Sequence, residues 1–409
     1  MLNKSKLTDA CHKFKIRGIP VIGNTNNGMI IGLDSDGETL VTKLQESVDV
    51  DLDALTDGQR ALYQALSDNN YLVNGESIAS QKRIIKATLH VTSRCNLQCE
   101  GCYSFEDSRN AKQDLSLDQM KKILNNVTAN GLDKLSISGG EPFMYSDLIE
   151  VLKYAKEDLG IKNILCTSNG YASINTYLDA WQYLDMLSFS LDGFDDETST
   201  IRPNSEFASI FGKMIYLKKQ GVNVEITFTL HKKNLKFYNE MKSFADSFEI
   251  PHHFSLLSVV EFGDCNSELV LDENDINEMI AFANSNKTVT DEKALKCSVS
   301  CGLGYKIISI AADGGIYPCI MFNGYSDFLM GNALESSIAD VIFNHDNKFL
   351  NLTVNDIENC KDCHVKYLCG GGYRFRGYAV AGDILHPDKK LCKGCINNIE
   401  VAINHLVGH

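Results

Sequence analysis

Fourteen cysteines carry most of the chemistry available to this 409-residue chain, because thiolates bind metal ions and iron–sulfur clusters. The chain does not open with the continuous apolar core of a secretory signal, so we expect a cytoplasmic protein whose thiols stay reduced. Metal or cluster ligation then explains the cysteines better than disulfides do. Eleven of them fall into three groups: Cys95, Cys99, Cys102; Cys297, Cys301, Cys319; and Cys360, Cys363, Cys369, Cys392, Cys395. For Cys11, Cys166 and Cys265 we expect buried apolar positions.

The first group has the spacing Cys95-Asn-Leu-Gln-Cys99-Glu-Gly-Cys102, which places three thiols on one short loop. A [4Fe–4S] cluster takes four thiolates, so a cluster held by three leaves one iron free to bind a cofactor. A structural zinc site usually closes with four ligands, and this loop offers no fourth Cys or His. The spacing therefore favours iron–sulfur chemistry, with zinc as the alternative.

The composition excludes several other classes of protein. Hydrophobic residues make up 44% and charged residues 22% of the chain, as in ordinary globular proteins. The formal charge of −14 argues against a nucleic-acid partner, because phosphates attract clustered Lys and Arg. No apolar run approaches the ~20 residues needed to span a bilayer, so we expect no membrane association.

Six strand-like runs alternate with helical patterns from about Leu89 to Val260, which is typical of a parallel sheet built from βα units. The predicted strands are Leu89–Thr92, Lys134–Ser138, Asn163–Thr167, Met186–Leu191, Val222–Leu230 and His253–Val260. The amphipathic stretches between them include Leu117–Ala129, Asp147–Leu159, Phe211–Gln220 and Asn234–Phe248. Six units predict an α/β fold with a partial (β/α)6 TIM-type barrel. Its lateral opening would suit a long substrate.

Two further segments flank this barrel, and the predicted domains are 1–84, 85–290 and 291–409. In the first, we expect strands at Ile19–Ile22 and Gly28–Leu33, a turn at Asp34–Gly37, and helices near Glu38–Gln45 and Asp57–Leu66, ending in Tyr71–Val73. It is a small α+β, winged-helix-like domain. The last segment is loop-rich, holds eight cysteines and ends in the amphipathic run Ile396–Leu406, so we expect it to need metal for folding.

The cysteine loop resembles the radical S-adenosylmethionine (SAM) superfamily, whose signature CxxxCxxC follows the first strand of a partial (β/α)6 barrel. Ser138-Gly-Gly-Glu-Pro142, Thr167-Ser-Asn-Gly170 and Ser190-Leu-Asp-Gly193 stand at the ends of the next three strands. Arg202 resembles a residue that pairs with the methionine carboxylate. The family has an aromatic residue before the third cysteine, where this chain has Gly101 followed by Tyr103. The resemblance implies a SAM site formed by Gly139, Gly140, Glu141, Pro142, Ser168, Asn169, Ser190, Asp192 and Arg202, with paired glycines that let the backbone approach the ligand closely.

The C-terminal cysteines resemble the SPASM domain, which carries up to two auxiliary [4Fe–4S] clusters. The resemblance implies an outer cluster on Cys360, Cys363, Cys369 and one of Cys392 or Cys395. An inner cluster would use Cys297, Cys301 and Cys319, with the other terminal cysteine or an open iron as fourth position. The pattern fails at Tyr373, where the family has a cysteine. Together with the cluster on Cys95, Cys99 and Cys102, the resemblance implies three [4Fe–4S] clusters. Two structural zinc sites are the alternative for the last segment.

Residues 1–84 resemble the recognition element that binds leader peptides by strand addition in maturases of ribosomally made peptides; a structural cap on the barrel is the alternative. The resemblance implies an enzyme that abstracts a hydrogen atom from a precursor peptide and installs a crosslink, a thioether first and a carbon–carbon bond next. Its partners would be that precursor and an electron donor such as flavodoxin or ferredoxin. The alternatives are an enzyme that oxidises Cys or Ser to formylglycine, as sulfatase maturation requires, and a zinc-bearing binding protein. No catalytic side chain is assigned.

Overall fold

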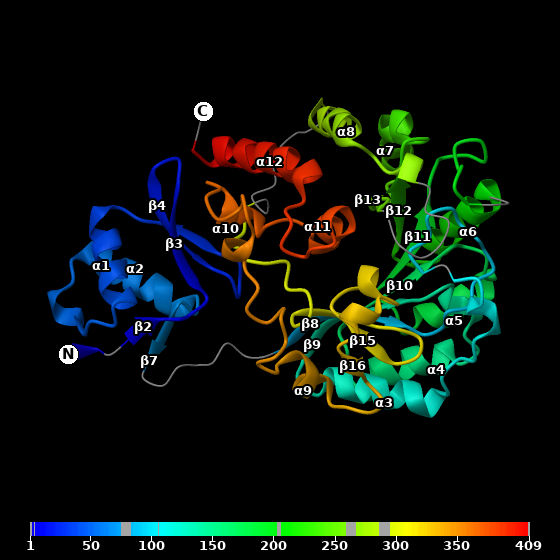
Figure 1. Ribbon diagram of the computed structural model, residues 1–409, viewed down its shortest axis with the longest axis horizontal. Helices are drawn as coiled ribbons and strands as arrows, with labels where there is room; N and C mark the ends of the chain where they lie inside the picture. The colour runs from blue at the N-terminus through cyan, green and yellow to red at the C-terminus, as the bar shows by residue number, and fades with distance from the viewer. Residues whose placement is uncertain are drawn as a thin grey trace.

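The computed structural model describes residues 2–3, 5–74, 83–104, 106–202, 206–258, 267–285 and 295–407 (Figure 1). Within them, one sheet contains nine strands in the order β13-β12-β11-β10-β9-β8-β14-β15-β16. Six consecutive strands are parallel and confirm the predicted partial barrel: β8 (Ile84–His90), β9 (Leu132–Ser138), β10 (Asn163–Ser168), β11 (Met186–Leu191), β12 (Val224–Leu230) and β13 (His252–Leu256).

Helices cover the outer face of these strands, and their apolar sides form the main core with the strand residues that point outward. They are α3 (Leu117–Thr128), α4 (Leu148–Lys153), α5 (Ile174–Trp181), α6 (Phe207–Lys219), α7 (Tyr238–Ser247) and α8 (Glu273–Ser285). Ser116 and Gln119 form a capping box that fixes the start of α3. Only part of the predicted helix Asp147–Leu159 is α-helical. The α-helix α4 ends at Lys153, and the chain continues as a π-helix, Tyr154–Asp158.

The C-terminal segment continues the barrel sheet, which the sequence did not predict. Its strand β14 (Ile307–Ile310) pairs in parallel with β8, and β15 (Gly315–Tyr317) and β16 (Gly331–Asn332) follow as antiparallel strands. Strands of two to four residues are too short to show an alternating pattern. The α-helices of this segment are α9 (Ile338–Ile342), α10 (Lys366–Cys369), α11 (Arg374–Ala381) and α12 (Lys389–Val407). The last contains the predicted run Ile396–Leu406.

The N-terminal residues form a small α+β unit around the antiparallel sheet β3 (Cys11–Ile16), β4 (Ile19–Asn24) and β5 (Ile30–Gly32). Helices α1 (Ser35–Gln45) and α2 (Asp57–Asp68) pack beside it, and two ribbons pair β1 (Leu2–Asn3) with β6 (Val50–Asp51) and β2 (Ser5–Leu7) with β7 (Leu72–Asn74). The predicted turn at Asp34–Gly37 was wrong. The Asp34 carboxylate accepts a hydrogen bond from the Gly37 N–H at 2.7 Å, so these residues are the cap and first turn of α1.

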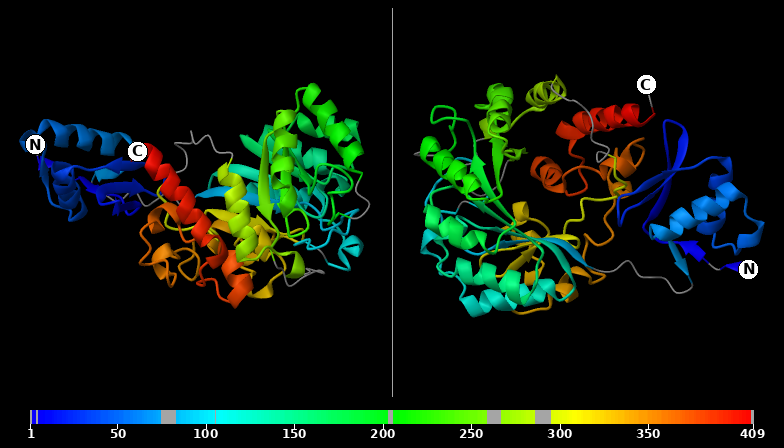
Figure 2. Two further views of the ribbon diagram at one scale, coloured as in Figure 1. Left: turned by 90° about the horizontal axis from the view of Figure 1, so that it is seen from above. Right: turned by 180° about the vertical axis from the view of Figure 1, so that it is seen from behind.

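This N-terminal unit packs against the C-terminal segment (Figure 2). The ring of His12 stacks on Tyr367 with centroids 5.2 Å apart, and Arg17 forms an ion pair with Glu400 of α12 at 2.9 Å. Apolar side chains of one sheet face, including Phe14, join the apolar cluster around Ile399. The first 74 residues are therefore placed by the C-terminal helices.

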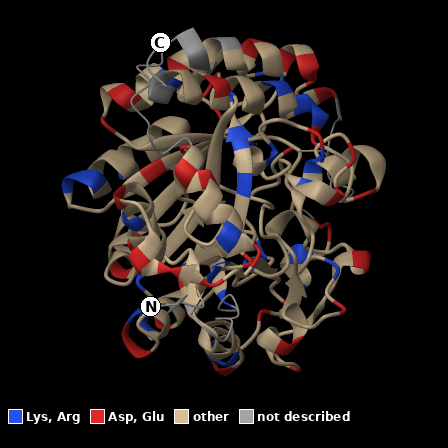
Figure 3. Ribbon diagram, turned by 90° about the vertical axis from the view of Figure 1, so that its left-hand side faces the viewer, with Lys and Arg blue, Asp and Glu red and all other residues tan. Residues whose placement is uncertain are grey.

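The proposed domain boundaries stay predictions, since the one after residue 84 falls one residue into β8 and the one after residue 290 lies outside the described residues. Val260, the predicted end of the sixth strand, and Cys265 also lie outside them. Among the described helices, none is long and apolar enough to cross a membrane. Acidic and basic residues are interspersed over the face in Figure 3.

Asn126 of α3 ties the barrel to the C-terminal segment. Its amide donates to the carbonyl oxygens of Ala333 and Ser336 at 2.9 and 2.7 Å and accepts from the N–H of Ile338 at 2.8 Å. We expect Asn126→Ala to cost about 2 kcal/mol, because three hydrogen bonds are lost. Differential scanning calorimetry should show a midpoint lower by a few degrees than for Asn125→Ala, whose amide bonds only Lys121 and Tyr154 of the barrel helices. Equal midpoints would contradict this role.

Candidate active site and auxiliary cysteine sites

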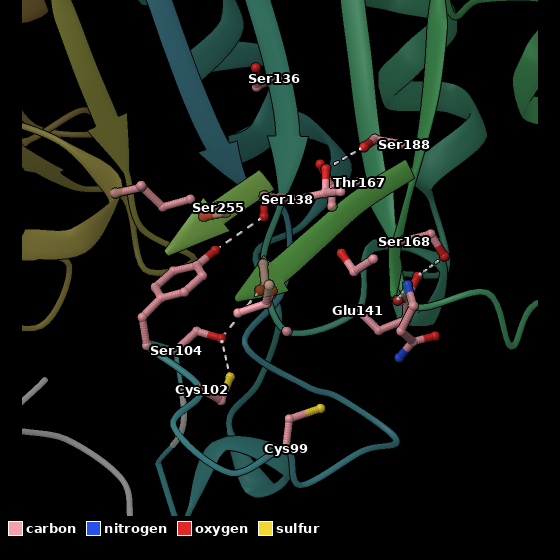
Figure 4. Close-up of a pocket in the computed structure, with 18 of the residues that line it drawn as sticks. Cys99, Cys102, Ser104, Ser136, Ser138, Glu141, Thr167, Ser168, Ser188 and Ser255 are labelled. Atoms are coloured by element: carbon pink, nitrogen blue, oxygen red, sulfur yellow. Dashed lines mark hydrogen bonds between the residues drawn. The ribbon is translucent and has the colours of Figure 1, made fainter. Parts of the chain in front are cut away.

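A cavity of about 580 Å³ follows the inner faces of the barrel strands to their carboxyl ends. Figure 4 shows hydroxyl side chains along its wall, with Cys99 and Cys102 on the loop at its mouth. Its deep end is lined by charged or ionisable side chains of Lys86, Lys134, Glu225 and His253. The hydroxyl groups lie between this end and the cysteines: Thr88, Ser136, Ser138, Thr167, Ser188, Ser190, Thr227, Thr229 and Ser255. The barrel interior is therefore a polar substrate-sized space.

Cys95, Cys99 and Cys102 all line this cavity, as the loop position predicted. Two guanidinium groups lie beside their sulfur atoms: Arg109 Nη1 is 3.9 Å from Cys102 Sγ, and Arg202 Nη1 is 3.9 Å from Cys99 Sγ. Such cations offset the negative charge of thiolates.

Arg109 is a residue that the sequence reasoning missed. Its side chain is 2% exposed and also donates to the carbonyl oxygen of Leu97, inside the cysteine loop. The neighbouring Asn110 amide oxygen accepts from the N–H of Cys95 at 2.9 Å. Nothing in the spacing of this polar stretch marks it, because its role depends on the loop folding back on itself.

The paired glycines after β9, which line the cavity, also let two backbone segments approach each other closely. A Cβ at Gly139 would overlap with the carbonyl oxygen of Thr92, and one at Gly140 with that of Arg94. The N–H of Gly140 donates to Thr92, and that of Glu141 to Arg94. The two glycines therefore allow a close approach to the backbone that leads into the cysteine loop.

Glu141 is a buried carboxylate at the cavity wall, 3% exposed. Burial raises the pKa of Glu141 to about 7. Three donors oppose that shift: the N–H of Asn169 at 2.8 Å, the N–H of Phe143 at 3.2 Å and the hydroxyl of Ser168 at 2.9 Å. The strand ends of β9 and β10 thus hold one carboxylate in a fixed orientation.

The remaining predicted SAM-binding residues divide into two sets. Ser168, Asn169, Ser190 and Arg202 line the cavity with Gly139, Gly140 and Glu141, and the Asn169 amide nitrogen lies 3.9 Å from Cys95 Sγ. Asp192 and Pro142 are not among the lining residues. Asp192 is fully buried behind Arg202 and pairs with its Nε at 3.0 Å, while Pro142 begins a short 3₁₀ turn.

The family's aromatic position before the third cysteine cannot be filled here. Gly101 has φ +73°, and a Cβ there would lie 3.0 Å from Leu257 Cδ1. Tyr103 instead lies with its hydroxyl 3.3 Å from that of Ser138 and its ring 6.0 Å from His90. Burial lowers the pKa of His90 to about 4, so this imidazole is neutral near pH 7.

Five C-terminal cysteines form one group, which we call the outer site: Cys360, Cys363, Cys369, Cys392 and Cys395. Cys369 and Cys395 share a hydrogen bond, which lowers the pKa of Cys369 and raises that of Cys395. Gly371 and Gly372 have φ of +87° and +73°, and their N–H groups also bond the Cys369 thiol. Such consecutive N–H donors favour an anion at that sulfur.

The buried guanidinium of Arg374 lies next to the outer site. Its Nη1 donates to the carbonyl oxygens of Ile384 and His386, whereas Nε and Nη2 have no hydrogen-bond partner among the described residues. The groups whose negative charge would act on it are Cys301 first, and then Cys360, Asp388 and Cys369. Five thiols, a nest of N–H donors and an unsatisfied buried cation fit an anionic thiolate cluster better than an apolar core would.

The predicted inner group is not assembled as expected. Cys301 and Cys319 pack in one aromatic cluster, but Cys297 lies against the N-terminal sheet. A Cβ at Gly23 would overlap with its Sγ, and its N–H donates to the Gly28 carbonyl at 2.9 Å. This backbone bond fixes Cys297 at the β4–β5 turn, where burial and then the neighbouring Cys11 raise the pKa of its thiol.

Among the described residues, no three His, Cys, Asp or Glu side chains are gathered as ligands of a single metal ion. Cys166 is fully buried in the barrel core, as expected. Three thiols, two guanidinium groups and adjoining open space fit a [4Fe–4S] cluster with a further ligand on the loop of Cys95, Cys99 and Cys102.

Replacing Arg109 with Leu should weaken cluster retention, because it removes both the cation beside Cys102 and the donor to Leu97. After anaerobic reconstitution we expect a loss of up to about four iron atoms per chain. Arg83→Leu is the matched control, since Arg83 is 44% exposed and pairs with Asp133 outside the site. Iron assays that give the same content for both variants would show that Arg109 does not support the loop.

Two family models match this chain. The model of the radical SAM superfamily matches residues 89–237, and that of SPASM, an iron–sulfur cluster-binding domain, matches residues 301–364. A similar protein is the antilisterial bacteriocin subtilosin biosynthesis protein AlbA of Bacillus subtilis. It is 27% identical over 274 residues, covering 64% of this chain and 59% of AlbA, so the chain spans less than two thirds of that relative.

Two solved structures share the fold. SuiB of Streptococcus suis, bound to precursor peptide SuiA, aligns with a TM-score of 0.61 and 17% identity over 95% of this chain and 100% of its own. The protein anSMEcpe with bound AdoMet aligns with a TM-score of 0.62 and 18% identity over 79% of this chain and 98% of its own. The two domain matches, on a barrel whose cysteine loop borders a polar cavity, show that the chain contains a radical SAM domain over residues 89–237 and an iron–sulfur SPASM domain over residues 301–364.

Proposed function

We propose that this protein is a peptide maturase: it abstracts a hydrogen atom from a ribosomally made precursor peptide and installs an intramolecular crosslink, a thioether first and a carbon–carbon bond next. The observation that carries the proposal is the polar cavity of about 580 Å³, which joins the cysteine loop to the interior of an open barrel. A space of that size and polarity accepts a peptide segment beside the cofactor.

SAM bound at the cluster supplies, on reductive cleavage, a carbon radical that can take hydrogen from an unactivated C–H bond. Cys95, Cys99 and Cys102 would hold the cluster. Glu141 and Arg202 both line the cavity, where the Glu141 carboxylate would accept hydrogen bonds from the amino group of SAM and Arg202 would face the SAM carboxylate. The buried pair between Arg202 and Asp192 fixes the guanidinium, so little reorganisation accompanies binding.

The cavity wall determines which substrate fits. Its many hydroxyl groups can donate and accept hydrogen bonds, which suits the amide groups of an extended peptide. Leu256, Leu257, Ile320 and Met321 line the same cavity with apolar surface. Because Ile320 and Met321 belong to the C-terminal segment, that segment shapes the substrate space as well as carrying cysteines.

Crosslinking two side chains removes two hydrogen atoms from the peptide, whereas the SAM-derived radical accepts only one. The second hydrogen leaves as a proton and an electron, and a cluster on the outer site would accept that electron. Cys360, Cys363, Cys369 and one of Cys392 or Cys395 would hold that cluster. A soluble donor such as flavodoxin or ferredoxin would supply the electron that cleaves SAM.

The named relatives support a peptide substrate. AlbA is a subtilosin biosynthesis protein, and SuiB has been solved with the precursor peptide SuiA. Many reduced thiols are consistent with a cytoplasmic location. The net charge of −14 is consistent with a protein that has no nucleic-acid partner.

The N-terminal unit offers an edge for a leader peptide at β5. Leu33 donates its N–H to Pro20 of β4, so in the antiparallel alternation the Gly32 N–H points away from β4. A Cβ at Gly32 would meet no atom within 4 Å, and the nearby apolar side chains Met29 and Ile19 are 42% and 43% exposed. An open, apolar strand edge is the surface that strand addition needs.

Formylglycine formation is the second candidate, because anSMEcpe, solved with AdoMet and a peptide called Cp18Cys, has the same fold. Mass spectrometry of peptide products separates the two. A thioether product has two hydrogen atoms fewer and one cysteine thiol that no longer reacts with iodoacetamide. A formylglycine product carries an aldehyde that reacts with hydrazide reagents.

Changing Cys95, Cys99 and Cys102 together to Ala should abolish formation of 5′-deoxyadenosine from SAM under dithionite and remove about four iron atoms per chain. Cys166→Ala is the control, since this buried cysteine lies in the barrel core and should keep both values. Liquid chromatography of the nucleoside product and an iron assay measure the outcomes. Product formed by the triple variant would place the radical chemistry elsewhere.

Gly32→Pro should weaken binding of a full-length precursor peptide about tenfold or more, because proline removes the outward N–H of β5 while leaving its bonds to β4. Gly32→Ala keeps that N–H and should bind as the parent does. Fluorescence anisotropy with labelled precursor peptides encoded beside the gene measures the affinities, and SAM cleavage without peptide should stay unchanged in both. If proline and alanine variants bind equally, leader recognition at β5 must be abandoned.

A further inference from the structure

The SPASM match leads one to expect an inner auxiliary cluster, and the residues at that position do not fit one. Among the described residues, two thiols, those of Cys301 and Cys319, lie in the aromatic cluster of the C-terminal segment, which we call the inner site. Cys319 is 7% exposed, and the aromatic side chains around it include Tyr317, Phe322 and Phe375. A [4Fe–4S] cluster takes four thiolates, and even the radical SAM loop supplies three.

Tyr373 occupies the position from which a further ligand would come. Its hydroxyl lies 3.8 Å from the Sγ of Cys319, and its ring packs against the same aromatic cluster. The guanidinium of Arg376 covers that ring at 4.8 Å and is itself fixed by Asp388 at 2.8 Å. The tyrosine is therefore held in place from both sides, and its ring takes up space next to the two thiols.

Among the described residues, the other cysteines of the C-terminal segment lie outside the inner site. Cys297 is tied to the β4–β5 turn by its N–H bond to Gly28. Cys392 and Cys395 lie with Cys369 in the outer site, where Cys395 and Cys369 share a hydrogen bond. Cys297 and Cys395 would each have to break one of these contacts to reach the inner site.

We propose that the inner site of this chain holds no iron–sulfur cluster and that Cys301, Cys319 and Tyr373 instead form part of an aromatic core between the cysteine loop and the outer site. Tyr103, which follows Cys102, packs against that same core. A substrate thiolate then has no inner iron to bind, and the outer site is the one auxiliary cluster position within the described residues. The total iron content that we expect depends on the proposed outer cluster. The comparison between parent and inner-site variants does not depend on it.

The test compares iron and acid-labile sulfide in the full-length protein after anaerobic reconstitution. The parent should bind about eight iron atoms per chain, four at the loop and four at the outer site. The double variant Cys301→Ser/Cys319→Ser should keep the parental iron content. The matched double variant Cys360→Ser/Cys363→Ser should lose about four, which checks the outer site independently.

Tyr373→Phe is the milder second variant, because it keeps the ring and removes only the hydroxyl. Unchanged iron content and an unchanged Mössbauer spectrum of the 57Fe-labelled protein are expected, since the phenol oxygen ligates nothing. A loss of about four iron atoms in Tyr373→Phe or in Cys301→Ser/Cys319→Ser would overturn the proposal, as would about twelve iron atoms in the parent. SAM cleavage, which the loop cluster supports, reports separately on the proposed function.

Discussion

The close approach of two backbone segments at the mouth of the barrel is the constraint on which the rest of the site depends. Gly139 and Gly140 leave no room for a Cβ against the residues that lead into the cysteine loop, and backbone hydrogen bonds join the two segments. This contact fixes the loop of Cys95, Cys99 and Cys102 relative to the end of β9. It also brings Glu141 to the same wall, so the cluster ligands and the buried carboxylate are positioned together.

Buried positive charge beside the cysteines is the second feature of the site. Arg109 and Arg202 lie beside the loop thiols, and Arg374 lies beside the outer site with two nitrogen atoms that have no partner among the described residues. Burying an unpaired guanidinium is costly, so each of these positions is stable only where negative charge is close. The cysteine loop and the outer site are thus suited to anionic clusters, whereas the inner site, where Arg374 also neighbours Cys301, is packed with aromatic rings and one tyrosine hydroxyl.

The C-terminal segment is part of the barrel architecture as well as a cysteine-rich extension. Its strand β14 pairs with β8, the strand that leads to the cysteine loop, and Asn126 of α3 bonds the start of α9. Ile320 and Met321 then reach the cavity wall. The same segment supports the N-terminal unit through α10 and α12, so it connects the substrate space with the proposed leader-binding edge.

The six parallel strands and the position of the cysteine loop could be predicted from the sequence, because alternating βα patterns and polar motifs at strand ends are local signals, and most of the residues proposed to bind SAM line one cavity. Tertiary structure alone decided three things. Arg109 became part of the site only when its loop folded back on Leu97. Gly139 and Gly140 turned out to face backbone, which spacing cannot reveal. Cys297 does not lie with the cysteines with which its spacing grouped it. Its N–H donates to the carbonyl oxygen of Gly28, more than 260 residues earlier, and residues close in sequence need not share a pocket.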